Sequence, residues 1–449
     1  MSTHHRPSQL IDLRRACPTR RLLPASSIAY ASRAILTDPF GYSDALLHGP
    51  DLGPTPLRQE VAVWLSEFYR PNAGPITAER LCITGGASQN LSCILQKFTD
   101  PVYTRAVWLV APTLQISCKI FEDNGLEGKL KVVLEDEEGL DINSLANLLA
   151  LEEENAIRSA NITPVFKSRA NYPKIYKHII YCMPTFKNPT SKSMSITRRR
   201  QLVELARTYD ALIIADDVFD FLRWGTDAEN TKPFPRISDI DRESQGVSDG
   251  YGNAVSNGSF SKLLAPGCRV GWLEGTEKFV IELAKAGSTQ AEGAPSQLVS
   301  MFIWNLLTTG TLQSHLSDIL IPVFSRRFEC LKHVFDSILS PLGVRLADSS
   351  PIHGGWFLWL QLPDWCDAKA FSEWVERDHN VLVACGEMYQ LRGYSGSSSE
   401  PSRAIRICLA WEEEDQLMEG VRRLGDGMRA MKEFRSPGGP MKIQNILKS

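Results

Sequence analysis

Short apolar runs alternate with helical patterns along the chain between about residues 81 and 275. The runs expected to be strands span residues 105–112, 178–184, 211–219 and 269–274, and helical patterns lie between them. Strands that run parallel need a long crossover, which is usually a helix. The alternation therefore predicts an α/β fold in which helices cover both faces of a mostly parallel sheet.

The pattern changes after about residue 315. Apolar residues from Phe324 to Ile338 recur every three or four positions, as on one face of a long helix, and strand-like runs follow at 355–362 and 404–411. These features predict a second, smaller α+β domain. Three polar, turn-rich segments are predicted to be surface loops, at about 154–174, 226–250 and 393–403.

The composition narrows the function classes. Of the 449 residues 22% are charged, and the formal net charge of −3 gives no basic field for nucleic acid or an anionic membrane. No run approaches the roughly 20 apolar residues that cross a bilayer. The ten cysteines occur singly and without the spacing of a metal site, which is typical of a reducing compartment. We expect a cytoplasmic protein that acts on a small molecule and binds no metal.

A glycine-rich segment, Thr84-Gly85-Gly86-Ala87-Ser88-Gln89-Asn90, lies between an apolar run and a helical pattern. Glycines there let backbone N–H groups approach a phosphate at the positive end of a helix, so Gly86, Ala87 and Ser88 are candidate phosphate-binding residues. The segment lacks the Gly-Lys-Ser/Thr ending of a nucleotide P-loop and the pattern of a dinucleotide site. By itself it fits an ordinary turn with a helix cap equally well.

A lysine stands beside small hydroxyl residues in Ser259-Phe260-Ser261-Lys262, and Pro266-Gly267-Cys268-Arg269 and Gly271-Trp272 follow. This arrangement resembles the SxSKxxxPGxRxGW pattern of the fold-type I pyridoxal-phosphate enzymes of the class I/II aminotransferase family. The resemblance implies that Lys262 binds pyridoxal phosphate as a Schiff base, and that Ser259, Ser261 and Arg269 hold its phosphate. A surface lysine beside a turn is the alternative.

Two further side chains fit this chemistry by their position. Asp216 ends an apolar run, where a buried carboxylate needs a partner, and it can keep the pyridinium nitrogen of the cofactor protonated; its neighbour Asp217 is the alternative. Arg406 shares a strand face with the small Ala404 and Cys408, where a guanidinium can bind a substrate carboxylate through two hydrogen bonds. A surface arginine on an edge strand is the competing interpretation.

The resemblance supplies two more roles. Asn188, in Lys187-Asn188-Pro189-Thr190, matches the asparagine that hydrogen-bonds the 3-oxygen of the cofactor ring, although a simple Asn-Pro turn would read the same. Tyr42 matches the tyrosine that these dimers donate to the phosphate in the neighbouring subunit; a core tyrosine is the alternative. A homodimer is therefore implied.

The resemblance extends from about Leu22 to Leu424, and Leu22-Leu23-Pro24 and residues 256–262 are closest to the fungal branch of the family. It implies a seven-stranded type of sheet in a large cofactor-binding domain at 56–315, and a small C-terminal domain at 316–435. Residues 1–55 are expected to contribute to the small domain and to the dimer contact. Residues 436–449 are expected to form a loose tail.

Three positions depart from the family pattern around the cofactor ring or the substrate. Phe219 replaces the usual tyrosine and removes a hydroxyl donor, which forfeits a hydrogen bond to a charged group of roughly 1.5–3 kcal/mol. Leu114 replaces the aromatic ring that stacks on the pyridine, and Ala16 stands near the place where relatives carry a glycine beside the substrate carboxylate. We expect the cofactor chemistry to be retained and the substrate side to be altered.

Two enzyme functions follow, and Lys262 is the general base at the substrate α-carbon in both. One is amino-group transfer from an amino acid to a 2-oxo acid, in fungal amino-acid or secondary metabolism. The alternative is β-elimination by a carbon–sulfur lyase on cysteine- or glutathione-derived conjugates, as in pathways to gliotoxin-like disulfides. A transcription regulator with an aminotransferase-like domain would need a DNA-binding domain ahead of Leu22, so we do not expect one. No residue marks the substrate side chain.

Overall fold

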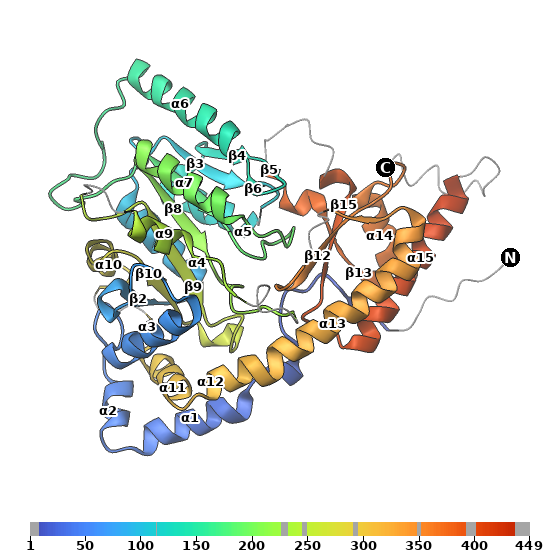
Figure 1. Cartoon of the computed structure of the whole chain (residues 1–449), viewed down its shortest axis with the longest axis horizontal. Helices are drawn as coiled ribbons and strands as arrows, with labels where there is room; N and C mark the ends of the chain where they lie inside the picture. The colour runs from blue at the N-terminus through green and yellow to red at the C-terminus, as the bar shows by residue number, and fades with distance from the viewer. Residues whose placement is uncertain are drawn as a thin grey trace.

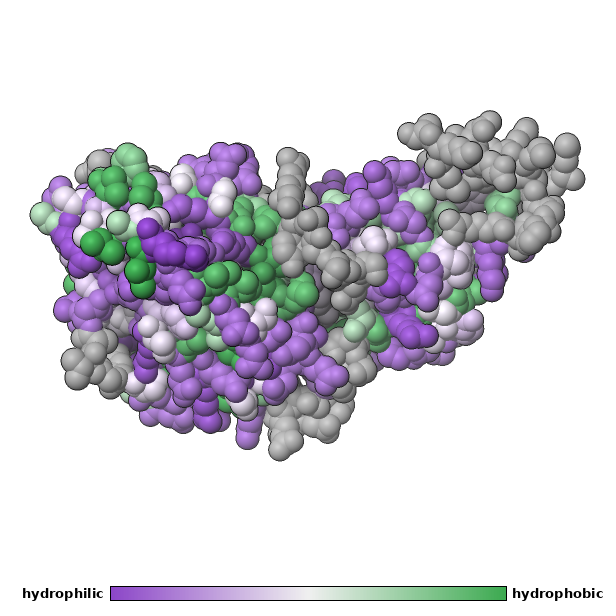
Figure 2. Space-filling model, turned by 90° about the horizontal axis from the view of Figure 1, so that it is seen from above, coloured by the Kyte–Doolittle hydropathy of each residue, from purple (hydrophilic) through white to green (hydrophobic). Residues whose placement is uncertain are grey.

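The computed structural model describes residues 9–113, 115–225, 232–244, 249–290, 295–347, 352–391 and 401–435. Figure 1 shows a larger lobe and a smaller lobe, with a long helical segment that includes α13 (Ile321–Val334) running from one towards the other. From above, hydrophilic side chains cover most of both lobes, and separate apolar areas interrupt them on the larger one (Figure 2). Among the described residues, no helix combines the length and apolar character needed to traverse a membrane.

The larger lobe contains a seven-stranded sheet with the order β2-β10-β9-β8-β7-β3-β4. Its strands are β2 (Leu81–Thr84), β3 (Ala106–Val110), β4 (Leu130–Val133), β7 (His178–Cys182), β8 (Ala211–Asp216), β9 (Ala254–Ser259) and β10 (Gly271–Glu274). Neighbouring strands from β9 to β4 are parallel, and β10 is antiparallel to both of its neighbours. The predicted mostly parallel α/β sheet is therefore confirmed.

Helices cover both faces of this sheet (Figure 1). One core contains residues of α4 (Ala87–Phe98), α5 (Gln115–Phe121) and α10 (Glu277–Ala284), and the other contains residues of α6 (Ile142–Arg158), α7 (Ile196–Thr208) and α9 (Ile237–Glu243). In β3, Leu109 belongs to the first core, whereas Trp108 and Val110 belong to the second. This alternation is that of a strand buried on both faces.

The smaller lobe contains an antiparallel sheet with the order β11-β12-β15-β14. Its strands are β11 (Arg345–Leu346), β12 (Phe357–Gln361), β14 (Ala384–Cys385) and β15 (Ala404–Cys408). The helix α15 (Glu414–Arg435) packs against both α13 and α14 (Ala368–His379). The predicted apolar helix face is confirmed, because Phe324, Leu331 and Phe335 are buried.

The N-terminal segment contacts both lobes. The strand β1 (Ile11–Asp12) pairs with β13 (Val381–Leu382), and the backbone N of Cys408 donates to the carbonyl of Leu13 at 2.7 Å. The chain continues through α1 (Ala25–Thr37), α2 (Gly41–Leu46) and α3 (Thr55–Tyr69), and all three contact α11 (Gln297–Thr308). The domain bounds at 55/56 and 315/316 stay a prediction.

Shorter elements complete the chain. They are the hairpin β5 (Glu135–Asp136) and β6 (Gly139–Leu140), the helix α12 (Thr311–Ser314), and the single-turn or irregular helices η1 (Arg20–Leu22), η2 (Ala78–Arg80), η3 (Glu122–Leu126), η4 (Pro266–Cys268), η5 (His315–Leu320), η6 (Phe335–Leu339), η7 (Ser340–Leu342), η8 (Gly386–Tyr389) and η9 (Pro401–Arg403). Because η5 and η6 adjoin both ends of α13, the predicted long helix is longer than α13 alone.

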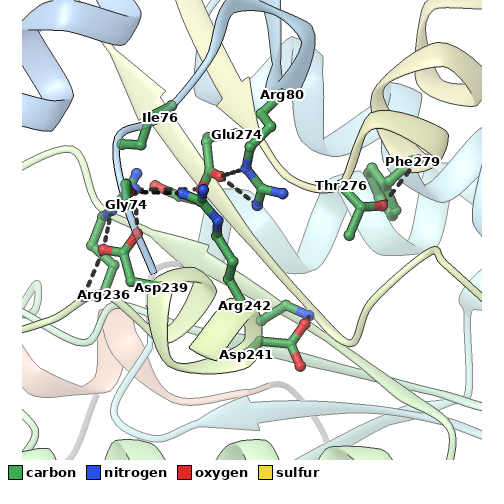
Figure 3. A network of polar contacts seen from close by, with 12 residues as sticks. Gly74, Ile76, Arg80, Arg236, Asp239, Asp241, Arg242, Glu274, Thr276 and Phe279 are labelled. Carbon is green, nitrogen blue, oxygen red and sulfur yellow. Dashed lines mark hydrogen bonds and ion pairs between the residues drawn. The ribbon is translucent and has the colours of Figure 1, made fainter. Parts of the chain in front are cut away.

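Two of the predicted surface loops contain helices, so those predictions were wrong in part. The helix α6 continues to Arg158 within 154–174, and α9 lies within 226–250. The sequence of α9 is polar, but its Asp239 is buried because it pairs with Arg236 at 2.8 Å. Figure 3 shows this pair beside Glu274 of β10, which binds Arg80. Charges paired with one another inside the protein allow a polar sequence to form a buried helix.

All six predicted strands are shorter in the structure than expected, and for two of them the backbone gives the reason. The strand predicted at 211–219 ends at Asp216, and a turn follows. The strand predicted at 269–274 begins at Gly271, since Arg269 adopts a left-handed conformation with φ of 49°. Most of the loop predicted at 393–403 and the whole tail at 436–449 lie outside the described residues.

Candidate active site

Lys262 lies just after β9, at the carboxyl end of the central strands, where α/β sheets place their ligand sites. Its Nζ is 3.5 Å from the carbonyl oxygen of Ala16, and the ring centroids of Trp356 and Phe219 are 4.4 and 5.6 Å from it. Burial lowers the pKa of this amine, against the opposing effect of Cys408. The lowered pKa leaves more of the amine neutral, as a nucleophile or a general base requires.

Asp216 is the last residue of β8, so it lies at the same carboxyl end of the sheet as Lys262. The hydroxyl of Tyr181 donates to its Oδ2 at 2.6 Å, whereas its Oδ1 is buried and has no hydrogen-bond partner. Burial raises the pKa of this carboxyl to about 6, although the hydrogen bond from Tyr181 and the charge of Lys262 lower it. Because an unpartnered buried oxygen is costly, Oδ1 marks a place for a donor that the protein does not supply.

Asp217 has different surroundings. Its Oδ2 accepts a hydrogen bond from Ser256, and burial raises the pKa of its carboxyl, as does the neighbouring Asp220. The contact with Tyr181 and the charge of Lys262 therefore distinguish Asp216 from its neighbour.

Residues from three segments meet where α4 begins. Ser259 donates to Ser261 at 2.9 Å, and Arg269 donates to the hydroxyl of Ser261 at 3.2 Å and to the carbonyl of Gly85 at 3.1 Å. A Cβ at Gly86, where φ is 94°, would lie 2.7 Å from the Arg269 guanidinium, so the backbone can approach it only as glycine.

The start of α4 completes this arrangement. The helix begins at Ala87 without a side-chain cap, and its second residue Ser88 is exposed. The first N–H groups of such a helix are open to an anion. Two hydroxyls, a guanidinium and a helix N-terminus thus form an anion cup after β9.

Arg406, in β15, is only 4% exposed, so the interpretation as a surface arginine is wrong. Its Nη1 donates to Oδ1 of Asn188 at 2.8 Å, its Nη2 donates to the carbonyl of Arg14 at 2.5 Å, and its Nε is buried without a partner. The guanidinium lies 4.3 Å from the ring centroid of Phe357 and 5.3 Å from that of Tyr389. A buried, oriented guanidinium of this kind can bind a carboxylate.

The model of the family described as aminotransferase class I and II matches residues 44–424, which is most of the chain. The chain belongs to this family. Class I and II aminotransferases are pyridoxal-phosphate enzymes, so the fold, the enzyme class and the cofactor inferred from the sequence are confirmed.

Relatives of this aminotransferase are found in fungi and in thermophiles. An uncharacterized protein of Saccharomyces cerevisiae is 31% identical over 426 residues, which are 91% of this chain and 94% of that protein. Aromatic-amino-acid aminotransferase 1 of Thermococcus litoralis is 28% identical over 94% of this chain and 88% of its own. The crystal structure of Pyrococcus horikoshii kynurenine aminotransferase in complex with PMP has a TM-score of 0.76 and 25% identity, and covers 94% of this chain and 92% of its own.

The positions that depart from the family pattern lie close to Lys262 in this aminotransferase, as far as they are described. Phe219 is buried and meets the rings of Trp356 and Phe357 edge-on, each at 5.5 Å. The carbonyl of Ala16 faces the Lys262 amine. Leu114 lies outside the described residues.

Tyr42 lies in α2 and is 48% exposed, so the interpretation as a core tyrosine is wrong. Among the described residues of the single chain, no hydrogen bond joins Tyr42 to Lys262 or to the anion cup. Its role toward a second subunit stays a prediction.

The aminotransferase site also contains two aromatic residues that the sequence reasoning missed. Tyr181 binds Asp216, and the only signal for it was a tyrosine in the apolar strand that precedes Asp216 along the chain. Trp356 lies over the Lys262 amine, and a signal for it was the pair of glycines before a strand-like run. Neither signal is specific by itself, and the pairing of β7 with β8 is what brings Tyr181 beside Asp216.

Proposed function

We propose that this aminotransferase binds pyridoxal phosphate at Lys262 and transfers the amino group of an amino acid to a 2-oxo acid. The observation that carries the proposal is the Asp216 carboxylate, which lies near the buried Lys262 amine. Its buried Oδ1 lacks a hydrogen-bond donor, and its Oδ2 accepts a hydrogen bond from Tyr181. A protonated ring nitrogen is the donor that this carboxylate fits.

The residues present fit the other groups of the cofactor as well. The anion cup formed by Ser259, Ser261, Arg269 and the first N–H groups of α4, at Gly86, Ala87 and Ser88, suits a phosphate. Asn188 would donate to the ring oxygen. When bound, the cofactor supplies an electron sink for the negative charge left at the substrate α-carbon.

Each protein group then has one task. Arg406 binds the substrate carboxylate and fixes the orientation of the α-carbon. The Nζ of Lys262 takes the α-proton, and burial favours the neutral amine that a base requires, because it lowers the pKa of this group. Asp216 keeps the proton on the ring nitrogen. The aromatic rings of Trp356 and Phe219 exclude water from the amine.

Arg406→Lys is expected to raise the KM for both the amino acid and the 2-oxo acid about tenfold or more. Lysine keeps the charge but cannot make the paired hydrogen bonds of a guanidinium, and one such bond is worth about 1.5–3 kcal/mol. Steady-state kinetics measure the effect. Arg403→Lys is the matched control, since Arg403 precedes the same strand and pairs with Asp364 instead. An unchanged KM in the Arg406 variant would remove this residue from the proposal.

Phe219→Tyr is expected to lower the pKa of the visible absorbance band of the holoenzyme by about 1–2 units. A tyrosine hydroxyl beside the ring oxygen would stabilise its anionic form by about 1.5–3 kcal/mol. A pH titration of the absorbance spectrum gives this pKa directly. If the pKa does not move, the hydroxyl does not reach the ring oxygen and the departure at this position is neutral.

Carbon–sulfur lyase activity is the second candidate. It is supported by the departures from the family pattern at Phe219 and Ala16, which lie close to the Lys262 amine. Its substrate would be a cysteine- or glutathione-derived conjugate in toxin biosynthesis. Holoenzyme incubated with amino acids and 2-oxoglutarate should form glutamate if it transfers amino groups. Release of thiol, ammonia and a 2-oxo acid from S-substituted cysteines, without an amino acceptor, would overturn transfer in favour of the lyase.

A homodimer is part of the proposal. Large apolar side chains of α1, α2 and the residues beside them are exposed in the single chain, Phe40 at 83% and Tyr30 at 68%, and such surfaces mark interaction sites. Light scattering is expected to give twice the 50.1 kDa chain mass. A monomer that keeps full activity would contradict the role of Tyr42 at the phosphate of a second subunit.

We further propose that the enzyme works in the cytoplasm, in fungal amino-acid or secondary metabolism. No disulfide joins any of the ten cysteines, which all lie among the described residues, as expected in a reducing compartment. The yeast relative supports a fungal setting. The substrate is then a free amino acid or an amino-acid conjugate.

A further inference from the structure

Asn188 lies in a strained loop between β7 and α7. Phe186 and Ser191, on either side of it, have φ of 48° and 62°, a left-handed conformation that side chains other than glycine rarely adopt. The loop closes on itself, because the backbone N of Ser191 donates to the carbonyl of Lys187 at 2.6 Å. Strained backbone of this kind persists only where its surroundings fix it.

One carboxylate from the larger lobe fixes this loop on both sides of Asn188. Glu135, in β5, lies with its Oε1 2.9 Å from Nζ of Lys187, and its Oε2 accepts a hydrogen bond from Thr190 at 3.3 Å. The side chains of Lys187 and Glu135 are only 4% and 9% exposed. Burial lowers the pKa of Lys187, and Glu135 acts against this effect. A buried lysine needs such a partner to remain charged.

The other side of the loop contacts the smaller lobe. Oδ1 of Asn188 accepts from Arg406, and the hydroxyl of Ser191 donates to the carbonyl of Phe357 in β12. With its oxygen bound to Arg406, the Asn188 amide keeps its NH₂ group as a donor for another partner. The loop therefore connects Glu135 to the arginine of the proposed carboxylate site.

We propose that the buried Lys187–Glu135 pair is a positioning device that holds Asn188 in place toward both Arg406 and the cofactor ring. The inference rests on the proposed function, because Asn188 matters only if the site binds the cofactor. Lys187 and Glu135 themselves touch neither cofactor nor substrate in this account. They act through the backbone and side chain of Asn188.

Three variants test the device: Lys187→Met, Glu135→Gln, and the double variant. Cofactor affinity is measured on the apo protein by tryptophan fluorescence, alongside the pKa of the visible band, KM and the melting temperature. Each single variant is expected to bind the cofactor about tenfold more weakly, which is the effect of misplacing one hydrogen bond to a charged oxygen. The pKa of the visible absorbance band should shift, and the KM should rise. Asp136→Asn is the matched control, because Asp136 lies in the same strand but pairs with Arg198 at 2.7 Å.

The double variant separates positioning from stability. Removing both charges leaves no unpaired buried ion, so the melting temperature of the double variant should recover toward that of the wild type. The loss of cofactor affinity and the shifted pKa of the visible band should persist. A double variant with wild-type affinity and band pKa would overturn the inference. If the wild-type protein shows no lysine-dependent visible band with the cofactor, the proposed function itself is overturned. If the wild type shows the band and both single variants keep the wild-type affinity and band pKa, only the positioning role is overturned.

Discussion

Lys262→Ala is expected to abolish the lysine-dependent visible band of the protein with bound pyridoxal phosphate and to lower kcat by at least about 10⁴-fold. One substitution removes both the covalent attachment and the base that takes the α-proton, so the two losses should appear together. Absorbance spectra of the reconstituted protein and single-turnover rates measure them.

The control for this substitution is another lysine of the larger lobe. Lys285 has a side chain that is 49% exposed and pairs with Glu282 on the surface, so Lys285→Ala should keep both the spectrum and the rate. A Lys262→Ala protein that keeps the visible band would show that the cofactor attaches elsewhere. The buried amine beside Trp356 would then be a structural lysine.

Asp216→Asn is expected to lower kcat/KM by roughly 10²–10³-fold, the scale seen when one preorganised electrostatic partner is removed. Asparagine keeps the shape and can still accept the Tyr181 bond, but it has no negative charge to hold a proton on the ring nitrogen. Asp217→Asn is the matched control at the adjacent position. Equal losses in the two variants would mean that the cluster acts through stability and that Asp216 has no special role.

The role of Asp216 also predicts how the cofactor affinity changes with pH. In the cofactor-free protein burial raises the pKa of Asp216 to about 6, so the carboxyl becomes neutral as the pH falls through that value. Only the ionised form pairs with a protonated ring nitrogen, and the cofactor affinity of the wild type should therefore decline below about pH 6. Asp216→Asn should lack this decline. Titrations of apo protein with cofactor between pH 5 and 8 measure both curves, and a variant that keeps the decline would assign it to another group.

The sequence was sufficient to predict a mostly parallel sheet, because β3, β7 and β8 are mostly apolar and helical patterns lie between the apolar runs. It did not identify β4 or the polar β9 as strands. It failed for α9, whose Asp239 pairs with Arg236 inside the protein. Polar side chains are predicted to be exposed unless their partners are known. One partner of Arg236 is Glu274 of β10, which is distant in the sequence. The extent of β8 was overestimated because the apolar Val218 and Phe219 continue the strand pattern into a turn.

The residues of the candidate site were recognisable because they stand in motifs, at strand ends or beside glycines. Lys262 was identified from a motif, Asp216 from its place at a strand end, and Arg406 from the small residues on its face of a strand. Each is found around the same site. Tyr181 and the Lys187–Glu135 pair could not be identified, since their importance depends on which strands and loops pack together. Residues that act through a neighbour leave no motif of their own.

Peptide mapping of the borohydride-reduced holoenzyme tests the central claim most directly. Reduction fixes the cofactor irreversibly to whichever lysine holds it, and mass spectrometry then locates the added phosphopyridoxyl group. We expect the group on one peptide only, at Lys262 within Ser259-Phe260-Ser261-Lys262. A label on any other lysine, or no label after reconstitution, would contradict the account.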